Sequence, residues 1–399
     1  MVISLIALIL LIALFYTWLG FPFMLFCAAK DLELSPATSD TVPDLSVSVI
    51  LAAYNEADHI GDRIANLLKL QPHGIAFDIH IGTDGCSDDT AENARQAAGD
   101  SSHVHVHAFT ERRGKVAVLK DLVSRSSSEL LLFTDANTNF EPGAIQRLMS
   151  HFSDGNIGGV CGQLVLVRDA GDLQREGGET LRDSEEGFYW RLETDLKRRE
   201  SALDSCLGAN GAIFAMRREL FWSKMPDNTR VDDLVIGMKV REQGFRVLYD
   251  PSAIAVETMP DTRDEWGRRV RIGSGDFQAL AFCRGCLSPS YGRFAWFFWS
   301  HKVLRWFTPH LCLACVLLIW PLFLVGTVFA TTLGVFTAFL VALFIVMSMV
   351  GHAMRHSGSV LARVPKLFTH FVSMQIALMA GFCRYTIGNM SGYWRRTPR

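Results

Sequence analysis

The sequence has 399 residues, a formal net charge of -2 and 49% hydrophobic residues. This length can hold one large domain together with a membrane part. The balanced charge, without a long basic run before the tail, disfavours nucleic acid as a partner. The nine cysteines are scattered, which is typical of a reduced cytosolic chain rather than a disulfide framework. Cys283 and Cys286 form a lone C-x-x-C, whereas a zinc ribbon needs a second such pair.

Four apolar stretches are predicted to interact with the membrane. Residues 2–19 carry no charge and are long enough to cross a bilayer at about 20 residues per helix. Their uncharged start favours an uncleaved anchor over a signal peptide. Residues 311–327 and 333–350 are a closely spaced pair of further spans, and residues 367–382 are a weaker fourth stretch interrupted by polar residues.

Basic residues predict the orientation of these spans. Arg355, Arg363 and Lys366 lie between the third and fourth stretches, which places that loop in the cytoplasm by the positive-inside rule. Counting back through two spans places residues 30–305 in the cytoplasm as well. A fourth full crossing would send the basic tail outside, against the same rule, so the sequence leaves the topology of that stretch open. We expect an integral protein of a bacterial-type inner or plasma membrane.

Strand-like runs alternate with helix-like runs between the first two apolar stretches, which predicts an α/β domain with a mostly parallel sheet. Strands are expected at 46–53, 75–82, 103–108, 130–134 and 158–167, and helices at 57–70 and from about 88. Aromatic and basic residues alternate over 296–306, which favours a helix in the membrane interface, although a plain juxtamembrane helix explains them equally well. The expected segments are an anchor (1–29), a linker (30–45), the α/β domain (46–290), the interfacial helix (291–306), a membrane region of two to three spans (307–390) and a basic tail (391–399).

Three histidines, His103, His105 and His107, alternate along one predicted strand and would share one face. No carboxylate or cysteine lies near them in the sequence, so a solvated strand face is favoured over a metal site.

Carboxylates stand at three positions that matter for chemistry. Asp84 and Asp135 each follow an apolar strand, and the pair Asp232-Asp233 precedes an amphipathic stretch. Ligands of α/β sheets bind in the crevice at the carboxyl ends of the strands, so we expect these acids to line one crevice. There Asp84 can accept a hydrogen bond from a ring N–H of a pyrimidine base, and Tyr54 can form a wall for the ring.

The motifs around these acids form an ordered series that resembles glycosyltransferase family 2, the inverting transferases of the GT-A fold. Similarity extends over about residues 46–306, and the spacing of the series is more specific than any one motif. Membrane members of that family include the hyaluronan, chitin, cellulose and poly-N-acetylglucosamine synthases. The matching motifs are A-A-Y-N-E (52–56), T-D-G-C-S-D-D-T (83–90), R-R-G-K (112–115), F-T-D-A-N (133–137), G-A-N-G-A-I-F (208–214) and D-D-L-V-I (232–236).

The resemblance implies a nucleotide-diphospho-sugar donor, usually a UDP-sugar, and Mg²⁺ or Mn²⁺. Asp135 would hold the metal through oxygen, and the metal would neutralise the leaving diphosphate. The family pattern is Asp-x-Asp, and here the second position is Asn137, whose neutral amide oxygen attracts a cation more weakly. The residues implied to bind the nucleotide are Ala53, Tyr54, Asn55, Glu56, Asp84, Lys115, Arg269 and Arg271.

Asp233 is the implied general base, at the position where related enzymes deprotonate the acceptor hydroxyl. Asp232 would face the acceptor, and it is also the alternative base or a helix cap. The small, backbone-rich turn at Asn210 and Gly211 would let the acceptor approach closely, although a tight turn into a strand explains it as well.

Processive relatives carry Gln-x-x-Arg-Trp near the mouth of the pocket. Here the segment 268–272 is Arg-Arg-Val-Arg-Ile, so Arg271 is kept while the Gln and Trp positions are replaced. Loss of the aromatic residue weakens the expectation of processive polymerisation.

The leading hypothesis is a cytoplasmic-face transferase that extends an exported polysaccharide. The few predicted spans would then require a partner subunit or a homo-oligomer for export. A single-addition transferase acting on a lipid-linked acceptor is the close alternative. A non-catalytic sugar-nucleotide sensor is a third hypothesis, which the retention of Asp84, Asp135 and Asp233 disfavours.

Overall fold

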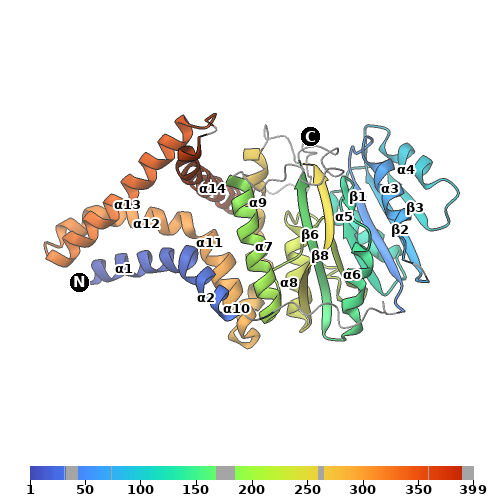
Figure 1. Cartoon of the computed structure of the whole chain (residues 1–399), viewed down its shortest axis with the longest axis horizontal. Coiled ribbons are helices and arrows are strands. Elements are labelled where there is room, and N and C mark those ends of the chain that lie inside the picture. The colour runs from blue at the N-terminus through green and yellow to red at the C-terminus, as the bar shows by residue number, and fades with distance from the viewer. Residues whose placement is uncertain are drawn as a thin grey trace.

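A computed structural model describes most of the chain (Figure 1). The described residues are 1–30, 32, 44–72, 74–167, 185–258, 265–357 and 359–388. Most of the predicted linker (30–45) and the whole predicted basic tail (391–399) lie outside them.

An eight-stranded sheet, in the order β3-β2-β1-β4-β7-β6-β8-β5, forms the centre of the α/β domain. The first four strands in the chain are parallel to one another, while β7 lies antiparallel between β4 and β6. The strands are β1 (Val47–Ala53), β2 (Phe77–Asp84), β3 (Val104–Phe109), β4 (Leu130–Thr134), β5 (Thr138–Phe140), β6 (Ile157–Val167), β7 (Phe214–Arg217) and β8 (Arg246–Thr258). All five predicted strands are confirmed, and β5, β7 and β8 were not predicted.

Helices cover both faces of this sheet, which is why β1 is apolar almost throughout and buried at every residue. One face packs against α3 (Ile60–Lys69), α4 (Thr90–Ala98) and α6 (Ala144–Ser150). The other face packs against α5 (Lys115–Arg125) and α8 (Asp232–Glu242). Both α5 and α8 begin beside the carboxyl ends of β1 and β4, and their first turns therefore carry the candidate site.

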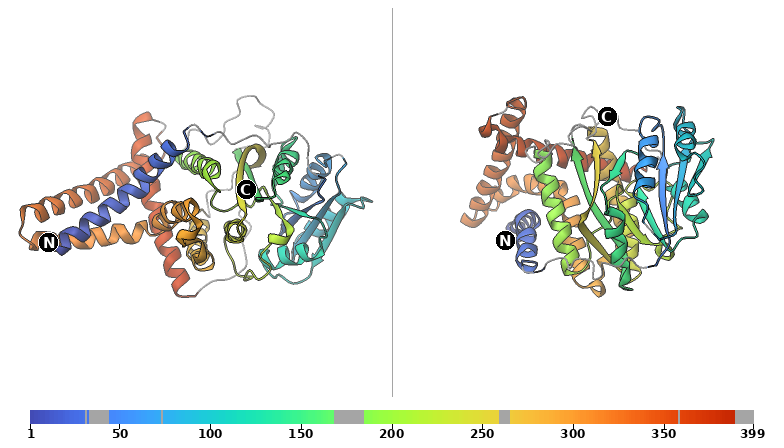
Figure 2. Two further views of the ribbon diagram at one scale, coloured as in Figure 1. Left: turned by 90° about the horizontal axis from the view of Figure 1, so that it is seen from below. Right: turned by 45° about the vertical axis from the view of Figure 1, so that its right-hand side comes forward.

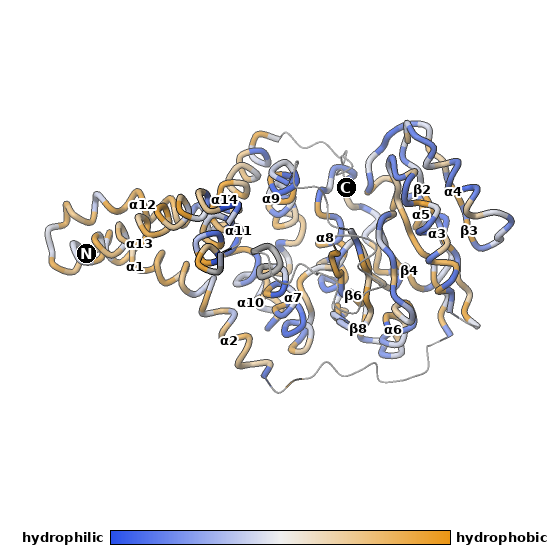
Figure 3. Tube along the Cα trace, turned by 45° about the horizontal axis from the view of Figure 1, so that its top comes forward, coloured by the Kyte–Doolittle hydropathy of each residue, from blue (hydrophilic) through white to orange (hydrophobic). Residues whose placement is uncertain are grey.

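Apolar helices extend from one side of the domain (Figures 2 and 3). Three helical segments are long and apolar enough to cross a membrane: Val2–Ala28, Val328–Ala353 (α13) and Arg363–Thr386 (α14). The first comprises α1 (Val2–Phe15), the π-helical η1 (Tyr16–Gly20) and α2 (Phe21–Ala28). The predicted stretches 2–19, 333–350 and 367–382 lie inside these segments. The predicted stretch 311–327 falls mainly on α12 (Thr308–Leu324), which qualifies only together with the preceding helix, from which it is bent by 58°.

That preceding helix runs over Arg293–Trp306 as α10 (Arg293–Phe297), the π-helical η9 (Phe298–Val303) and α11 (Leu304–Trp306). Three polar side chains in its second half, His301, Lys302 and Arg305, pack against α7 (Glu185–Leu203) and do not point into solvent. His301 bridges Glu200 and Glu193, Lys302 Nζ lies 3.1 Å from Glu193 Oε2, and Arg305 pairs with the same carboxylate. Burial raises the pKa of Glu193, but these cations outweigh it and hold that pKa well below its usual value. The cluster therefore attaches the apolar helices to the α/β domain.

The remaining long helix, α9 (Glu265–Phe282), joins the two parts. It packs against α14, and a Cβ placed on Gly381 would lie 2.7 Å from the backbone of Gly273. The absence of side chains at these two positions lets the helices approach closely. The candidate site consequently lies beside helices that are themselves in contact with a candidate membrane span.

Candidate active site

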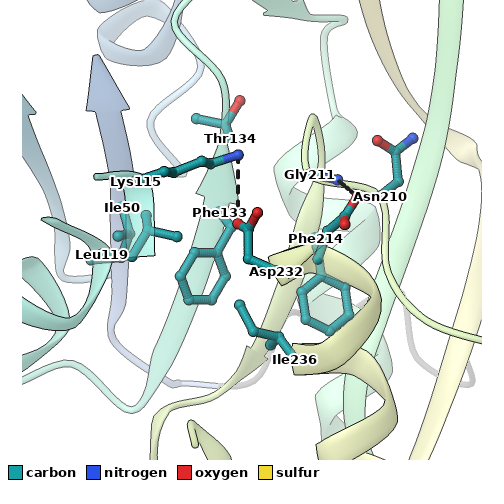
Figure 4. A pocket seen from close by; sticks show the side chains of 11 residues that line it. Ile50, Lys115, Leu119, Phe133, Thr134, Asn210, Gly211, Phe214, Asp232 and Ile236 are labelled. Carbon is teal, nitrogen blue, oxygen red and sulfur yellow. Dashed lines mark hydrogen bonds and ion pairs between the residues drawn. The ribbon is translucent and has the colours of Figure 1, made fainter. Parts of the chain in front are cut away.

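Charged side chains from three elements meet at the carboxyl edge of the sheet, and Figure 4 shows two of them, Lys115 and Asp232. Lys115 is the first residue of α5, Asp135 follows β4, and Asp232 begins α8. Lys115 Nζ donates a hydrogen bond to Asp135 Oδ1 at 3.0 Å and lies 3.6 Å from Asp232 Oδ2. These predicted residues, far apart in the sequence, therefore share one crevice.

Gly211 lies at the centre of this crevice. A Cβ built on it would be 3.6 Å from Lys115 Nζ, 3.7 Å from Asp135 Oδ2 and 3.7 Å from Asp233 Oδ2. Its backbone N–H donates to Asp233 Oδ2 at 3.2 Å, and the N–H of Leu234 donates to Asp233 Oδ1 at 2.8 Å. Two backbone N–H groups thus orient the carboxylate of Asp233. This carboxylate lies beside Gly211, which has no side chain to fill the space.

The electrostatics of the crevice are dominated by acids. Burial lowers the pKa of Lys115, but Asp135, Asp232 and Asp233 outweigh it and raise that pKa above its ordinary value. Burial, opposed by Lys115 and reinforced by the neighbouring acids, raises the pKa of Asp232. Three carboxylates against one ammonium leave an excess of negative charge, which favours a cationic ligand.

Asp84 has a role that sequence reasoning did not anticipate. It is fully buried, and its two oxygens accept hydrogen bonds from the backbone N–H groups of Arg113 at 2.7 Å and Gly114 at 2.9 Å. Those residues immediately precede Lys115, so Asp84 fixes the start of α5. A Cβ on Gly85 would lie 2.7 Å from the backbone nitrogen of Arg112, which explains a glycine there. Contact of Asp84 with a base stays a prediction.

The A-A-Y-N-E motif forms the turn that follows β1, with Ala53 as the last strand residue and buried. The guanidinium of Arg112 lies 3.7 Å from the centre of the Tyr54 ring. Asn55 adopts a positive φ of 54°, and its Oδ1 accepts from the N–H of Ser87 at 2.9 Å. The N–H of Glu56 donates to Thr90 Oγ1 at 2.8 Å. This motif and the T-D-G-C-S-D-D-T motif are therefore joined into one surface.

Asp135 and Asn137 fit a divalent metal. The Asp135 side chain is 35% exposed, and its Oδ2 faces the position of the missing Gly211 side chain. Asn137 lies in the turn that directly follows Asp135, and its amide oxygen is the atom that could bind a cation. A carboxylate and an amide oxygen, completed by phosphate oxygens of a substrate, are the type of donor set that Mg²⁺ accepts.

The G-A-N-G-A-I-F segment forms the turn that leads into β7, which agrees with the interpretation of this segment as a tight turn before a strand. Gly208 has a φ of +74°, and Asn210 Oδ1 accepts from the N–H of Ala212 at 3.0 Å. The turn also places Gly211 in the crevice, so the structural and functional interpretations of this segment are compatible.

The two predicted arginines of the 268–272 segment differ in their surroundings. Arg269 donates to Glu265 Oε1 at 2.7 Å, so its guanidinium is engaged within α9. Burial lowers the pKa of Arg271, and the charges of Asp232, Asp233 and Asp135 oppose that shift. The Arg271 side chain is therefore within electrostatic range of the acids of the crevice, and contact of either arginine with a ligand stays a prediction.

Two further residues join this region without any signal in the motifs. Arg230 is buried, and its guanidinium donates to Ser274 Oγ at 3.0 Å. Burial, together with Arg384 and Arg271, lowers the pKa of Arg230 to about 10. Burial also raises the pKa of Asp276 to about 8, opposed by Lys302 and reinforced by Asp233 and Glu193. Contacts between α8, α9 and α14 bring these groups together, and local sequence does not encode such contacts.

Comparison with known proteins agrees with the geometry. Residues 48–223 match the family model Glycosyl transferase family 2. The chain is 25% identical over 251 residues to a poly-β-1,6-N-acetyl-D-glucosamine synthase of Staphylococcus aureus (strain MSSA476), covering 60% of this chain and 58% of that protein. It is 27% identical over 244 residues to an N-acetylglucosaminyltransferase of Rhizobium leguminosarum bv. viciae, covering 59% and 54%. The chain therefore spans only a little over half the length of these relatives.

Among solved structures, the mannosyltransferase PcManGT from Pyrobaculum calidifontis in complex with GDP-Man and Mn²⁺ aligns over 96% of this chain and 99% of its own. The TM-score is 0.68 at 19% sequence identity, which establishes a common fold. The predicted α/β architecture with the GT-A fold is confirmed, and residues 48–223 within it are similar to glycosyltransferase family 2.

Proposed function

We propose that the protein is a metal-dependent, inverting glycosyltransferase that moves a sugar from a nucleotide-diphospho-sugar to an acceptor hydroxyl. The proposal rests on one observation: Lys115, Asp135 and Asp233 all lie close to Gly211, which has no side chain. A transferase of this type needs a cation and a positive side chain at the leaving diphosphate, and a base at the acceptor. The crevice supplies candidates for all three.

Asp233 is the proposed general base. In an inverting displacement the acceptor oxygen forms a bond to the anomeric carbon while the bond from that carbon to the diphosphate oxygen breaks. The acceptor proton passes to the Asp233 carboxylate, and the electron pair leaves with the nucleoside diphosphate. The backbone N–H groups of Gly211 and Leu234 orient that carboxylate. Asp232 instead pairs with Lys115, which suits it to hold the lysine and to border the acceptor.

The donor would lie along the carboxyl ends of β1, β2 and β4. The turn of Ala53, Tyr54, Asn55 and Glu56, together with Asp84, would bind the nucleoside. Lys115 and Arg271 would bind the diphosphate, with Arg269 contributing after release from Glu265. Asp135 and Asn137 would hold Mg²⁺ or Mn²⁺, which neutralises charge on the diphosphate. Asn210 and Gly211 would contact the acceptor.

The names of the relatives support N-acetylglucosamine as the first sugar to test, from a UDP donor, and a glycan as the acceptor. A lipid-linked acceptor is a second candidate, favoured by a specific observation. Arg230, Arg271 and Arg384 interact electrostatically where α9 packs against α14, a candidate membrane span. An anionic lipid headgroup would be complementary to that charge.

The protein would act at the cytoplasmic face of a membrane, with lipid as its surroundings. The apolar helices and the basic loop at Arg355, Arg363 and Lys366 support this orientation. Export of a polymer would require a partner subunit or a homo-oligomer.

A donor panel tests the proposal. The full chain in nanodiscs is incubated with Mn²⁺, membrane lipid extract and one donor at a time. The donors include UDP-N-acetylglucosamine and GDP-mannose, and mass spectrometry measures the masses of the products. We expect sugar transfer from one donor, and the product mass separates a polymer from a single addition. Binding of a donor without transfer to any acceptor would favour the sensor hypothesis.

A further inference from the structure

Five side chains that favour metals gather on one face at the edge of the sheet. β3 is an edge strand, and its residues Val104, His105 and His107 pair with Ile79, His80 and Gly82 of β2. Side chains alternate along a strand, so His103, His105 and His107 face the same side as Asp78 and His80. Ile79 and Val104 belong to the core on the other side. Strand pairing thus supplies the carboxylate that the sequence around the histidines lacks.

The distances within this group are short. Asp78 Oδ1 lies 3.7 Å from His103 Nδ1 and 3.9 Å from His105 Nε2. The ring of His80 is 4.9 Å from that of His105 and 5.8 Å from that of His107, centre to centre. One ligand atom from each of Asp78, His80 and His105 lies within 4.8 Å of the other two.

His80 is the fixed member of the group. It is 7% exposed, and its buried Nδ1 has no hydrogen-bond partner among the described residues. A buried polar nitrogen without a partner is costly unless something binds it.

A metal ion fits the spacing after a small adjustment. Zinc–nitrogen bonds of about 2.0–2.1 Å in a tetrahedron separate the ligand atoms by roughly 3.4 Å. The present separations must therefore contract by up to about 1.4 Å. The side chains of Asp78 and His105 are 35% and 42% exposed, so they can rotate toward His80 without repacking the core. The positive charge of Arg125 acts on His80 and His107 and opposes a metal, and the Asp78 carboxylate contributes the opposite charge beside His80.

This group is separate from the crevice at Asp135. Asp84, at the crevice end of β2, is six residues beyond Asp78, which corresponds to about 20 Å along a strand. Figure 1 shows β2 and β3 at the end of the molecule opposite the apolar helices. A cation here would not contact the donor and would act on the sheet edge instead.

We infer that Asp78, His80 and His105 bind one divalent transition metal of the kind that imidazole favours, Zn²⁺ above all, with His103 able to complete the coordination. The ion would join the edge strand β3 to β2. It would thereby stabilise β3, an edge strand that is hydrogen-bonded to a neighbouring strand on only one side. This inference does not depend on the proposed transferase activity.

Zinc binding by the full chain tests the inference. The purified protein in detergent, with Mg²⁺ in excess to occupy the crevice, is titrated with Zn²⁺ by calorimetry, and Co²⁺ replaces it for absorption spectra. We expect one equivalent of Zn²⁺, a tetrahedral Co²⁺ spectrum and a higher melting temperature with zinc. His105→Ala and Asp78→Asn should each weaken binding at least roughly tenfold, since even changes beyond the direct ligands cost about 10–100-fold.

His356→Ala is the matched control, because this histidine is exposed and lies far along the chain near the end of α13. It should keep the wild-type affinity and stabilisation. Absence of stoichiometric zinc binding would overturn the inference. Equal affinity in wild type, His105→Ala and Asp78→Asn would overturn it too, because the zinc would then be bound elsewhere.

Discussion

Lys115 Nζ lies 3.0 Å from Asp135 Oδ1 and 3.6 Å from Asp232 Oδ2, so one ammonium group joins the end of β4 to the start of α8. This contact couples the proposed metal position to the proposed base beside it. Lys115 and its acidic neighbours can each be substituted separately to test this contact.

Lys115→Met removes the cation from this contact. Asp232 is then left buried without its partner, and we expect a loss of about 2 kcal/mol in the free energy of unfolding. This is less than for a fully buried pair, because the Asp135 side chain is 35% exposed. The KM for the donor should rise at least about tenfold, if the ammonium binds diphosphate with about 1.4 kcal/mol or more.

Lys120→Met on the same helix is the control for this variant. Lys120 pairs with Asp227, whose side chain is 57% exposed, and it lies outside the crevice lining. Chemical denaturation and donor titration of both variants measure the difference. Equal behaviour of the two would remove Lys115 from the donor site.

Gly211→Ala tests whether the open backbone is needed. The added methyl group would meet its charged neighbours at 3.6–3.7 Å, which is ordinary contact distance, so folding should be unaffected. The methyl group would nevertheless occupy the space proposed for the acceptor. We expect kcat/KM for the acceptor to fall by about tenfold or more, which is roughly 1.4 kcal/mol. Gly155→Ala, at a position with no atoms within 4 Å of the new Cβ, should leave both activity and melting temperature unchanged.

Asn137→Asp tests the metal assignment. A charged carboxylate in place of the neutral amide adds a unit of negative charge beside Asp135, which strengthens the attraction of a divalent cation. The Mn²⁺ concentration for half-maximal activity should fall by about tenfold, and Asn137→Ala should raise it. Activity as a function of Mn²⁺ after treatment with EDTA provides the measurement. An unchanged metal requirement in both variants would argue that Asn137 does not contact the ion.

Asp276 predicts a pH dependence of stability. Burial raises its pKa to about 8, so the folded protein keeps a proton that the unfolded chain has released above about pH 4. The contribution of this proton to the free energy of unfolding is complete below the unfolded pKa and is lost as the pH rises through the folded pKa. The free energy of unfolding should therefore fall between about pH 4 and pH 8 by up to roughly 1.4 kcal/mol per pH unit, then level off. Asp276→Asn should lack this component in thermal unfolding across pH 5–9, and parallel curves for the two proteins would contradict the assignment.

Some parts of this structure could be predicted from the sequence, and others could not. The run 47–53 is apolar because both faces of β1 are covered, and Asp84 and Asp135 end their strands, so the first half of the sheet and its crevice were predictable. The antiparallel β7 was not, because it pairs with β4 across more than eighty residues and has only Phe214–Arg217 to signal it.

Side-chain partners brought in from distant elements were also beyond prediction. The helix at Arg293–Trp306 has the composition of an interfacial helix, yet His301 and Arg305 are buried against Glu193. Asp78 reaches the histidines of β3 only through the register of two strands. Such contacts depend on tertiary packing, which periodicity in the sequence does not report.

The most direct test of the central claim is nucleoside-diphosphate release by the full chain in nanodiscs with Mn²⁺, comparing wild type, Asp233→Asn and Asp100→Asn. The Asp100 side chain is exposed in a loop and serves as the control. We predict donor-dependent release by wild type and Asp100→Asn, and a loss of at least about 100-fold in Asp233→Asn, as removal of a general base entails. Undiminished release by Asp233→Asn would contradict the account and move the base to another group, with Asp232 the first to examine.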